Sequence, residues 1–216
     1  MRHRLHRLHR LHRLHRLHRL LSRPRTSLLA AGVGLALLGG AAGAAADSDV
    51  IVDDPPVLAT AAVRDGTPVD GIPSGPMVAD GYHIHAHLNV FVNGVGVWVP
   101  AGVGVTRPIV LDPLRHDPVV KAAKGYYWLH THDESGVIHA EAPEKHAFTL
   151  GQFFDVWGQP LSRHQVGPAK GDVTVLVDGV KFPDDPRQVP ITPHAVIQLN
   201  VGKDVAFLPY DFPAPF

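Results

Sequence analysis

Residues 82–94 read YHIHAHLNVFVNG, and this stretch decides the expected fold. His, Asn and Phe at positions 83, 85, 87, 89 and 91 alternate with apolar residues, as they do in a strand with two different faces. Asn93 and Gly94 then precede a second apolar run, Val95 to Val99. Both residues tolerate the positive φ that a type I′ turn requires, so the stretch predicts a β-hairpin.

A second hairpin is predicted for residues 126–141, with its turn at residues 133–136. If the turn is centred on Glu134 and Ser135, His130 faces His139 on the opposite strand. Directly opposed side chains have Cβ atoms about 4.5–5.5 Å apart. The register therefore predicts contact between these two histidines.

One helix is indicated by residues 149–158, which read TLGQFFDVWG. Thr149 is a suitable N-cap, the apolar residues of 150–157 fall at helical spacing, and Gly158 can end the helix. Further strands are expected at 173–177 and 195–201. The fold class that follows is α+β, dominated by strands, with antiparallel hairpins and one short helix.

Three segments are expected along the chain. Residues 1–46 combine a basic Arg-Leu-His repeat with an uncharged apolar run over 27–46 that ends in small residues, which is typical of a signal peptide. An uncleaved membrane anchor over 27–46 is the alternative interpretation. Residues 47–80 are rich in Pro and Gly and indicate a flexible linker, and 81–216 form the His-rich domain. The protein is therefore expected outside the cytoplasm, secreted, periplasmic or at the cell surface.

The formal net charge is zero, but the basic and acidic residues are distributed very unevenly along the chain. Nine of the 20 Lys and Arg lie in the first 26 residues, and all 20 Asp and Glu follow Ala46. An acidic domain argues against nucleic-acid binding, which needs a basic face. The chain has no cysteine, so a thiolate metal site is excluded.

Histidine spacing predicts a metal site. Residues i and i+2 of a strand share a face, so His85 with His87, and His130 with His132, can each converge on one ion. His139 and Glu141 lie on the same predicted face of the second hairpin. The candidate ligands are His85, His87, His130, His132, His139 and Glu141. Imidazole and carboxylate ligands favour zinc or Cu(II), with Fe(II) as a further option.

Three strings, 82–94, 129–141 and 148–158, resemble a family of exported, largely uncharacterised bacterial and archaeal proteins. The similarity spans roughly residues 82–202, and LHTHDESGVIHAE is its most specific element. The resemblance implies one domain with a common site and implies no reaction.

Three functions stay open from the sequence. The first is metal binding or handling outside the cytoplasm, with the metal ion as the partner. The second is a metal-dependent hydrolase or oxidoreductase with an open coordination position. The third is a structural exported domain whose histidines sense pH.

Overall fold

The computed structural model describes residues 56–78 and 80–214. The predicted leader, the apolar run over 27–46 and the first part of the predicted linker lie outside these residues. No helix among the described residues has the length and apolar character needed to cross a bilayer.

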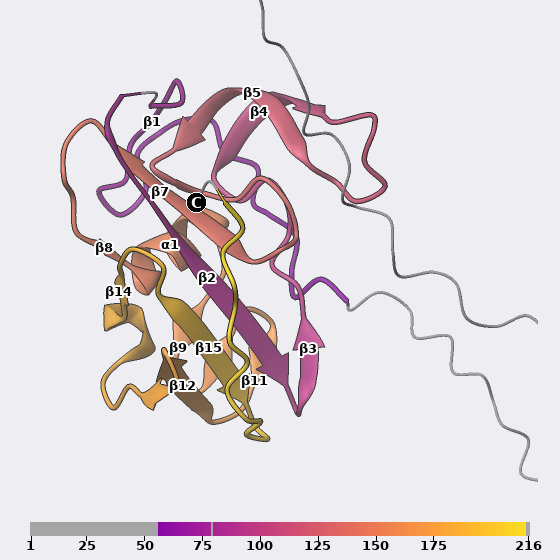
Figure 1. Cartoon of the computed structure of the whole chain (residues 1–216), viewed down its shortest axis with the longest axis vertical. Helices are drawn as coiled ribbons and strands as arrows, with labels where there is room; N and C mark the ends of the chain where they lie inside the picture. Colours follow the sequence, from indigo (N-terminus) through magenta and orange to yellow (C-terminus); the bar gives the residue numbers. More distant parts are fainter. Residues whose placement is uncertain (1–55, 79, 215–216) are drawn as a thin grey trace, which may run out of the picture. The chain divides into compact units, whose positions relative to one another are not determined.

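The largest sheet has seven strands and is built around one long central strand, β2 (Tyr82–Val92) (Figure 1). Its strand order is β13-β12-β15-β2-β7-β6, and β3 also pairs with β2. Its other strands are β3 (Val95–Val97), β6 (Leu129–His130), β7 (Val137–Ala142), β12 (Val173–Val177), β13 (Val180–Lys181) and β15 (Val196–Val201). Neighbours pair antiparallel except β15, which lies parallel to β2.

The first predicted hairpin is confirmed. β2 and β3 pair antiparallel, and the turn between them has φ of 52° at Asn93 and 90° at Gly94. Positive φ at two successive residues is what the Asn-Gly pair allows at low cost. The strand-dominated α+β class with one short α-helix is likewise confirmed.

The second predicted hairpin forms only in part. β6 and β7 pair in the predicted register, with His130 opposite His139. However, Tyr126 and Tyr127 end β5 (Val120–Tyr127), which belongs to a different sheet and pairs with β1 (Ser74–Gly75) and β4 (Val105–Leu111). The chain therefore passes from one sheet to the other around Trp128.

Smaller pairings complete the described structure. One sheet has the order β11-β10-β9, and β14 pairs with β8. Their bounds are β8 (Phe148–Thr149), β9 (Leu161–Ser162), β10 (Gln165–Val166), β11 (Ala169–Lys170) and β14 (Pro190–Ile191), and a 3₁₀ turn covers Pro186–Gln188.

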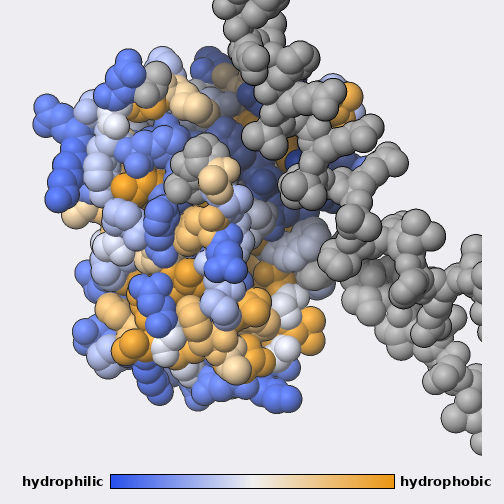
Figure 2. Space-filling view, viewed as in Figure 1, coloured by the Kyte–Doolittle hydropathy of each residue, from blue (hydrophilic) through white to orange (hydrophobic). Residues whose placement is uncertain are grey.

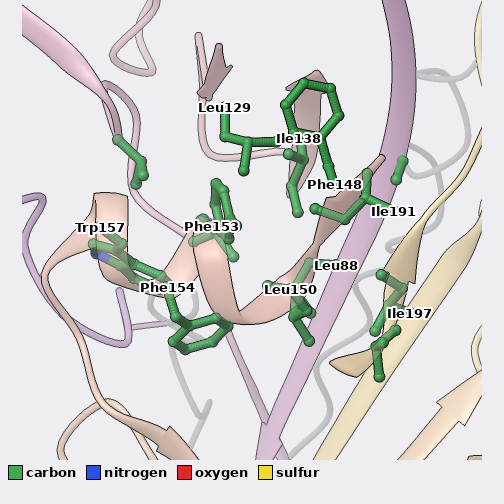
Figure 3. Packing of buried hydrophobic residues seen from close by; sticks show 14 of the residues in the cluster. Leu88, Leu129, Ile138, Phe148, Leu150, Phe153, Phe154, Trp157, Ile191 and Ile197 are labelled. Carbon is green, nitrogen blue, oxygen red and sulfur yellow. The ribbon is translucent and has the colours of Figure 1, made fainter. Parts of the chain in front are cut away.

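The helix α1 (Leu150–Trp157) has the predicted bounds. The Thr149 side chain accepts from the Gln152 amide, the Gln152 side chain accepts from the Thr149 amide, and Gly158 ends the helix at φ 79°. Both ends thus satisfy backbone groups that would otherwise lack partners. Figure 3 shows the apolar face of α1 packed among residues of the large sheet, with these side chains labelled: Leu88, Leu129, Ile138, Leu150, Phe153, Phe154, Trp157 and Ile197.

Residues 56–78 differ from the flexible linker that the sequence predicted. Leu58 and Ile72 are buried in the core, and β1 adds residues 74 and 75 to the edge of β5. The Trp157 indole donates to the carbonyl of Thr60, and the Arg64 guanidinium donates to the carbonyl of Val156. This segment therefore packs against the end of α1 and contributes apolar residues to the core.

The C-terminal segment crosses in front of β15 and β2 (Figure 1). The Leu208 amide donates to Gln198 of β15 at 2.8 Å, and the Asn89 side chain of β2 donates to the Leu208 carbonyl at 3.0 Å. On the face shown in Figure 2, hydrophobic residues are interspersed among hydrophilic ones over the lower part of the domain. The segment explains why β15 carries buried polar side chains, since Gln198 and Asn200 bond to its carbonyls.

Candidate metal centre

Three neighbouring strands and the segment after β6, which contains His132, bring five histidines and one glutamate together. On β2 and β7, His83 lies opposite Glu141 and His85 lies opposite His139. On the other side of β7, His130 of β6 also lies opposite His139. Because β7 is the middle strand, His139 has histidines on both sides.

Two overlapping groups of histidines follow from this arrangement. Within each group, one ligand atom from each residue lies within 4.8 Å of the others. We call His83, His85 and His139 the outer group, because the His83 side chain is 40% exposed. We call His130, His132 and His139 the inner group, because the His130 side chain is fully buried.

In the outer group, two Nε2 atoms approach the same nitrogen of the shared ring. The Nε2 atoms of His83 and His85 lie 3.3 and 3.2 Å from Nδ1 of His139. A tetrahedral zinc ion with Zn–N bonds of about 2.0–2.1 Å separates two nitrogen ligands by roughly 3.3 Å. The observed spacing therefore matches that of ligands around one ion.

In the inner group, backbone carbonyls fix the tautomers of two rings. Nδ1 of His130 is 2.9 Å from the Tyr127 carbonyl, and Nδ1 of His132 is 2.8 Å from the Val120 carbonyl. A carbonyl oxygen only accepts, so each Nδ1 carries the proton and each Nε2 of a neutral ring carries a lone pair. The two Nε2 atoms face each other at 3.2 Å. A metal-binding histidine commonly donates its other N–H to a carbonyl in this way.

Glu141 lies beside members of both groups. Its Oε1 is 3.2 Å from Nε2 of His83, 3.7 Å from Nδ1 of His139 and 3.8 Å from Nε2 of His130. Within the described part of the chain, this buried oxygen has no hydrogen bond of good geometry. A buried carboxylate oxygen without such a bond is costly, and a cation among these nitrogens would compensate it.

The pKa values of the ligands favour the forms that bind a metal. Burial, with the neighbouring imidazoles His139 and His132 adding to it, lowers the pKa of His130 to about 3. Burial and the rings of His139 and His83 lower the pKa of His85 to about 3. Burial acts to raise the pKa of Glu141, but the surrounding histidines outweigh it and lower that pKa to about 2. At neutral pH His85 and His130 are therefore neutral imidazoles and Glu141 is a carboxylate, which are the ligating forms.

The residues around His130 of the inner group are tightly packed. Gly104 has φ of 66°, and a Cβ there would lie 2.2 Å from the Leu129 carbonyl and 3.2 Å from the His130 Cβ. The Tyr126 ring lies 5.0 Å from that of His130, centroid to centroid. Burial and the nearby Glu141 raise the pKa of Tyr126. Position 104 thus has to be glycine for the backbone to approach His130 this closely.

The structure brings four of the six predicted ligands into the two groups, and Glu141 beside them. His87, the sixth, lies outside both groups. Its Nε2 donates to the Ser135 carbonyl at 2.7 Å, and its ring stacks on Tyr210 at 3.7 Å. The strand alternation alone favoured His87, but β7 begins opposite it at Val137, so it has no histidine across the strand pair.

His83 is the member of the outer group that the sequence interpretation left out of the candidate ligands. It belongs to the same alternating set as His85 and lies opposite Glu141. The signal was present in the HxHxH pattern, because residues i, i+2 and i+4 share one face. The pairing of β2 with β7 decides which of these histidines belong to the candidate site, because it places His83 and His85, but not His87, opposite Glu141 and His139. Asp133 lies outside both groups, and its carboxylate accepts from the Ser135 amide in its own turn.

Comparisons with protein-family models, with curated proteins and with solved structures give no match. The resemblance to a family of exported proteins stays a prediction.

Proposed function

We propose that this protein binds a divalent metal ion outside the cytoplasm, through the histidines of the outer and inner groups. One observation carries the proposal. The Nε2 atoms of His130 and His132 face each other at 3.2 Å while both Nδ1 atoms donate to carbonyls. Two facing lone pairs repel in the neutral rings, and a shared cation turns that repulsion into coordination.

The ligand set supports zinc or Cu(II) as the ion. Imidazole nitrogens predominate, one carboxylate lies beside them, and the chain has no cysteine. Neutral imidazole suits zinc and copper, and Cu(I) would favour thiolate or thioether sulfur. Fe(II) is compatible with two histidines and a carboxylate, so it belongs in the same comparison.

The sequence of residues 1–46 supports the proposed location of the protein outside the cytoplasm. Expression of the full chain in a bacterial host tests it, because a cleaved leader leaves a new N-terminus near Asp47. We expect the mature chain in the periplasm or the medium. Full-length protein in the cytoplasm, with Met1 retained, would contradict this part of the proposal.

Metal content tests the binding itself. The full chain is prepared without a purification tag, with Gln at the six leader histidines: His3, His6, His9, His12, His15 and His18. We expect stoichiometric zinc or Cu(II) by mass spectrometry, and its loss in the combined variant His83→Gln/His85→Gln/His132→Gln, which removes ligands from both groups. His164→Gln is the matched control, because His164 is exposed and bonds Asp172 away from the centre.

The single variant His139→Gln guards against misfolding of the combined variant, since it changes one residue that belongs to both groups and should bind the ion more weakly. Circular dichroism checks the fold of each protein. A folded chain that takes up none of the three ions would contradict the proposal, as would equal metal content in the wild type and the folded combined variant. Metal-dependent turnover of a hydrolytic or oxidative substrate would move the assignment to a metalloenzyme.

A further inference from the structure

The two histidine groups have more ligands than one ion can hold at one position. The five rings do not merge into one set within 4.8 Å among the described residues, and only His139 belongs to both groups. Ligand atoms on opposite sides of one zinc ion lie at most about 4.2 Å apart. A single ion therefore has two distinct positions available to it.

Two ions at once would have too few ligands and too little negative charge. Both positions depend on the single ring of His139, and a neutral imidazole has a free lone pair on only one of its two nitrogens. Among the ion pairs of the described residues, Glu141 contributes the carboxylate within 4 Å of histidines in both groups. Two divalent ions this close would repel strongly, with one carboxylate to offset them.

We propose that the outer and inner groups are alternative positions for one divalent ion, which passes between them while His139 and Glu141 stay with it. This inference rests on the proposed function. The outer position begins at His83, whose side chain is 40% exposed, and the inner position ends at His130, whose side chain is fully buried. The arrangement leads an ion inward from solvent without releasing all its ligands, as expected of a metal-handling protein.

The geometry of Glu141 supports this passage. Its Oε1 lies closest to His83 of the outer group, at 3.2 Å, and is 3.8 Å from His130 of the inner group. His139 lies between them at 3.7 Å from the same oxygen. The carboxylate is thus near the ion at both positions, so the charge that stabilises the ion does not have to be replaced during the move.

The test combines metal counting with the spectrum of Co(II), a zinc substitute whose absorption reports its ligands. It uses the full chain with Gln at the leader histidines. The wild type should bind one Co(II). An outer variant, His83→Gln/His85→Gln, and an inner variant, His132→Gln, should each still bind one, with two different spectra. The combined variant should bind none, and His164→Gln should match the wild type.

Release kinetics test the passage. We expect an excess of chelator to remove the ion from the outer variant about tenfold more slowly than from the wild type, because the exposed exit is lost. The inner variant should release it at least as fast as the wild type.

Each possible failure points to a different conclusion. Two ions per wild-type chain would overturn the single-ion inference and leave the proposed metal-binding function intact. Loss of all binding in either the outer or the inner variant, with the fold retained, would show one undivided site. Unchanged release in the outer variant would overturn the passage. No ion on the wild type would overturn the proposed function itself.

Discussion

His85 of β2 and His139 of β7 lie directly opposite each other, with Nε2 of one 3.2 Å from Nδ1 of the other. This pairing joins the first hairpin to the second, because His139 also lies opposite His130 of β6. The sharing of His139 makes it the central residue of the candidate site.

Replacement of His139 should weaken metal binding more than replacement of any ligand that belongs to one group. Loss of a ligand's supporting partner costs 10–100-fold in affinity, so we expect loss of this shared ligand in His139→Gln to cost at least about 100-fold. Competition titration against a chelator measures it, with His83→Gln and His132→Gln in parallel. A smaller loss in His139→Gln than in both of these variants would contradict the shared role.

Metal should stabilise the folded domain. A ligand at 100 times its dissociation constant adds about 2.7 kcal/mol to the free energy of unfolding if it binds only the folded state. Thermal melting with zinc or Cu(II) and with chelator should show this gain in the wild type and in His164→Gln. The gain should shrink in His132→Gln, and an equal gain in all three proteins would indicate binding elsewhere.

The metal-free domain should lose stability as the pH falls below about 6.5. Burial lowers the pKa of His87 to about 4, against 6.5 for the unfolded chain, so the unfolded state binds more protons between these values. The free energy of unfolding therefore rises with pH in this window, by up to about 1.4 kcal/mol per pH unit for each such group. His85 and His130, with pKa values of about 3, act in the same direction.

Urea unfolding at several pH values in chelator measures this dependence. His87→Gln should reduce the slope between pH 4.5 and 6.5 by up to about 1.4 kcal/mol per pH unit. Gln can still donate to the Ser135 carbonyl that His87 Nε2 contacts. Metal content at neutral pH should not change, because His87 lies outside both groups. A flat profile in the wild type would contradict the buried, neutral state of these rings.

Gly104→Ala should damage both the fold and the site. The added Cβ would lie 2.2 Å from the Leu129 carbonyl, and φ of 66° is unfavourable for alanine. We expect a loss of about 2–3 kcal/mol in the free energy of unfolding, through overpacking and backbone strain. Metal affinity should fall with it, because Leu129 precedes His130 in β6. Gly75→Ala is the matched control, since a Cβ there meets nothing within 4 Å.

The local elements of this fold follow from the sequence. Asn93 and Gly94 specify a tight turn through their tolerance of positive φ, and Thr149 with Gln152 specifies the start of α1 through reciprocal capping. The contact of His130 with His139 was also predictable, because a short turn fixes the register of the strands beside it. Each of these features depends on residues close together in the chain.

Only the tertiary structure decided which histidines meet. The sequence places His83, His85 and His87 on one face of β2, but the pairing of β2 with β7 selects the first two for the site. The tertiary structure also shows that residues 56–78 contribute to the core, where Ile72 is fully buried. Such contacts join residues that are far apart in the chain, and no local turn or cap specifies their register. Their choice depends on which apolar faces pack together, a property of the whole fold.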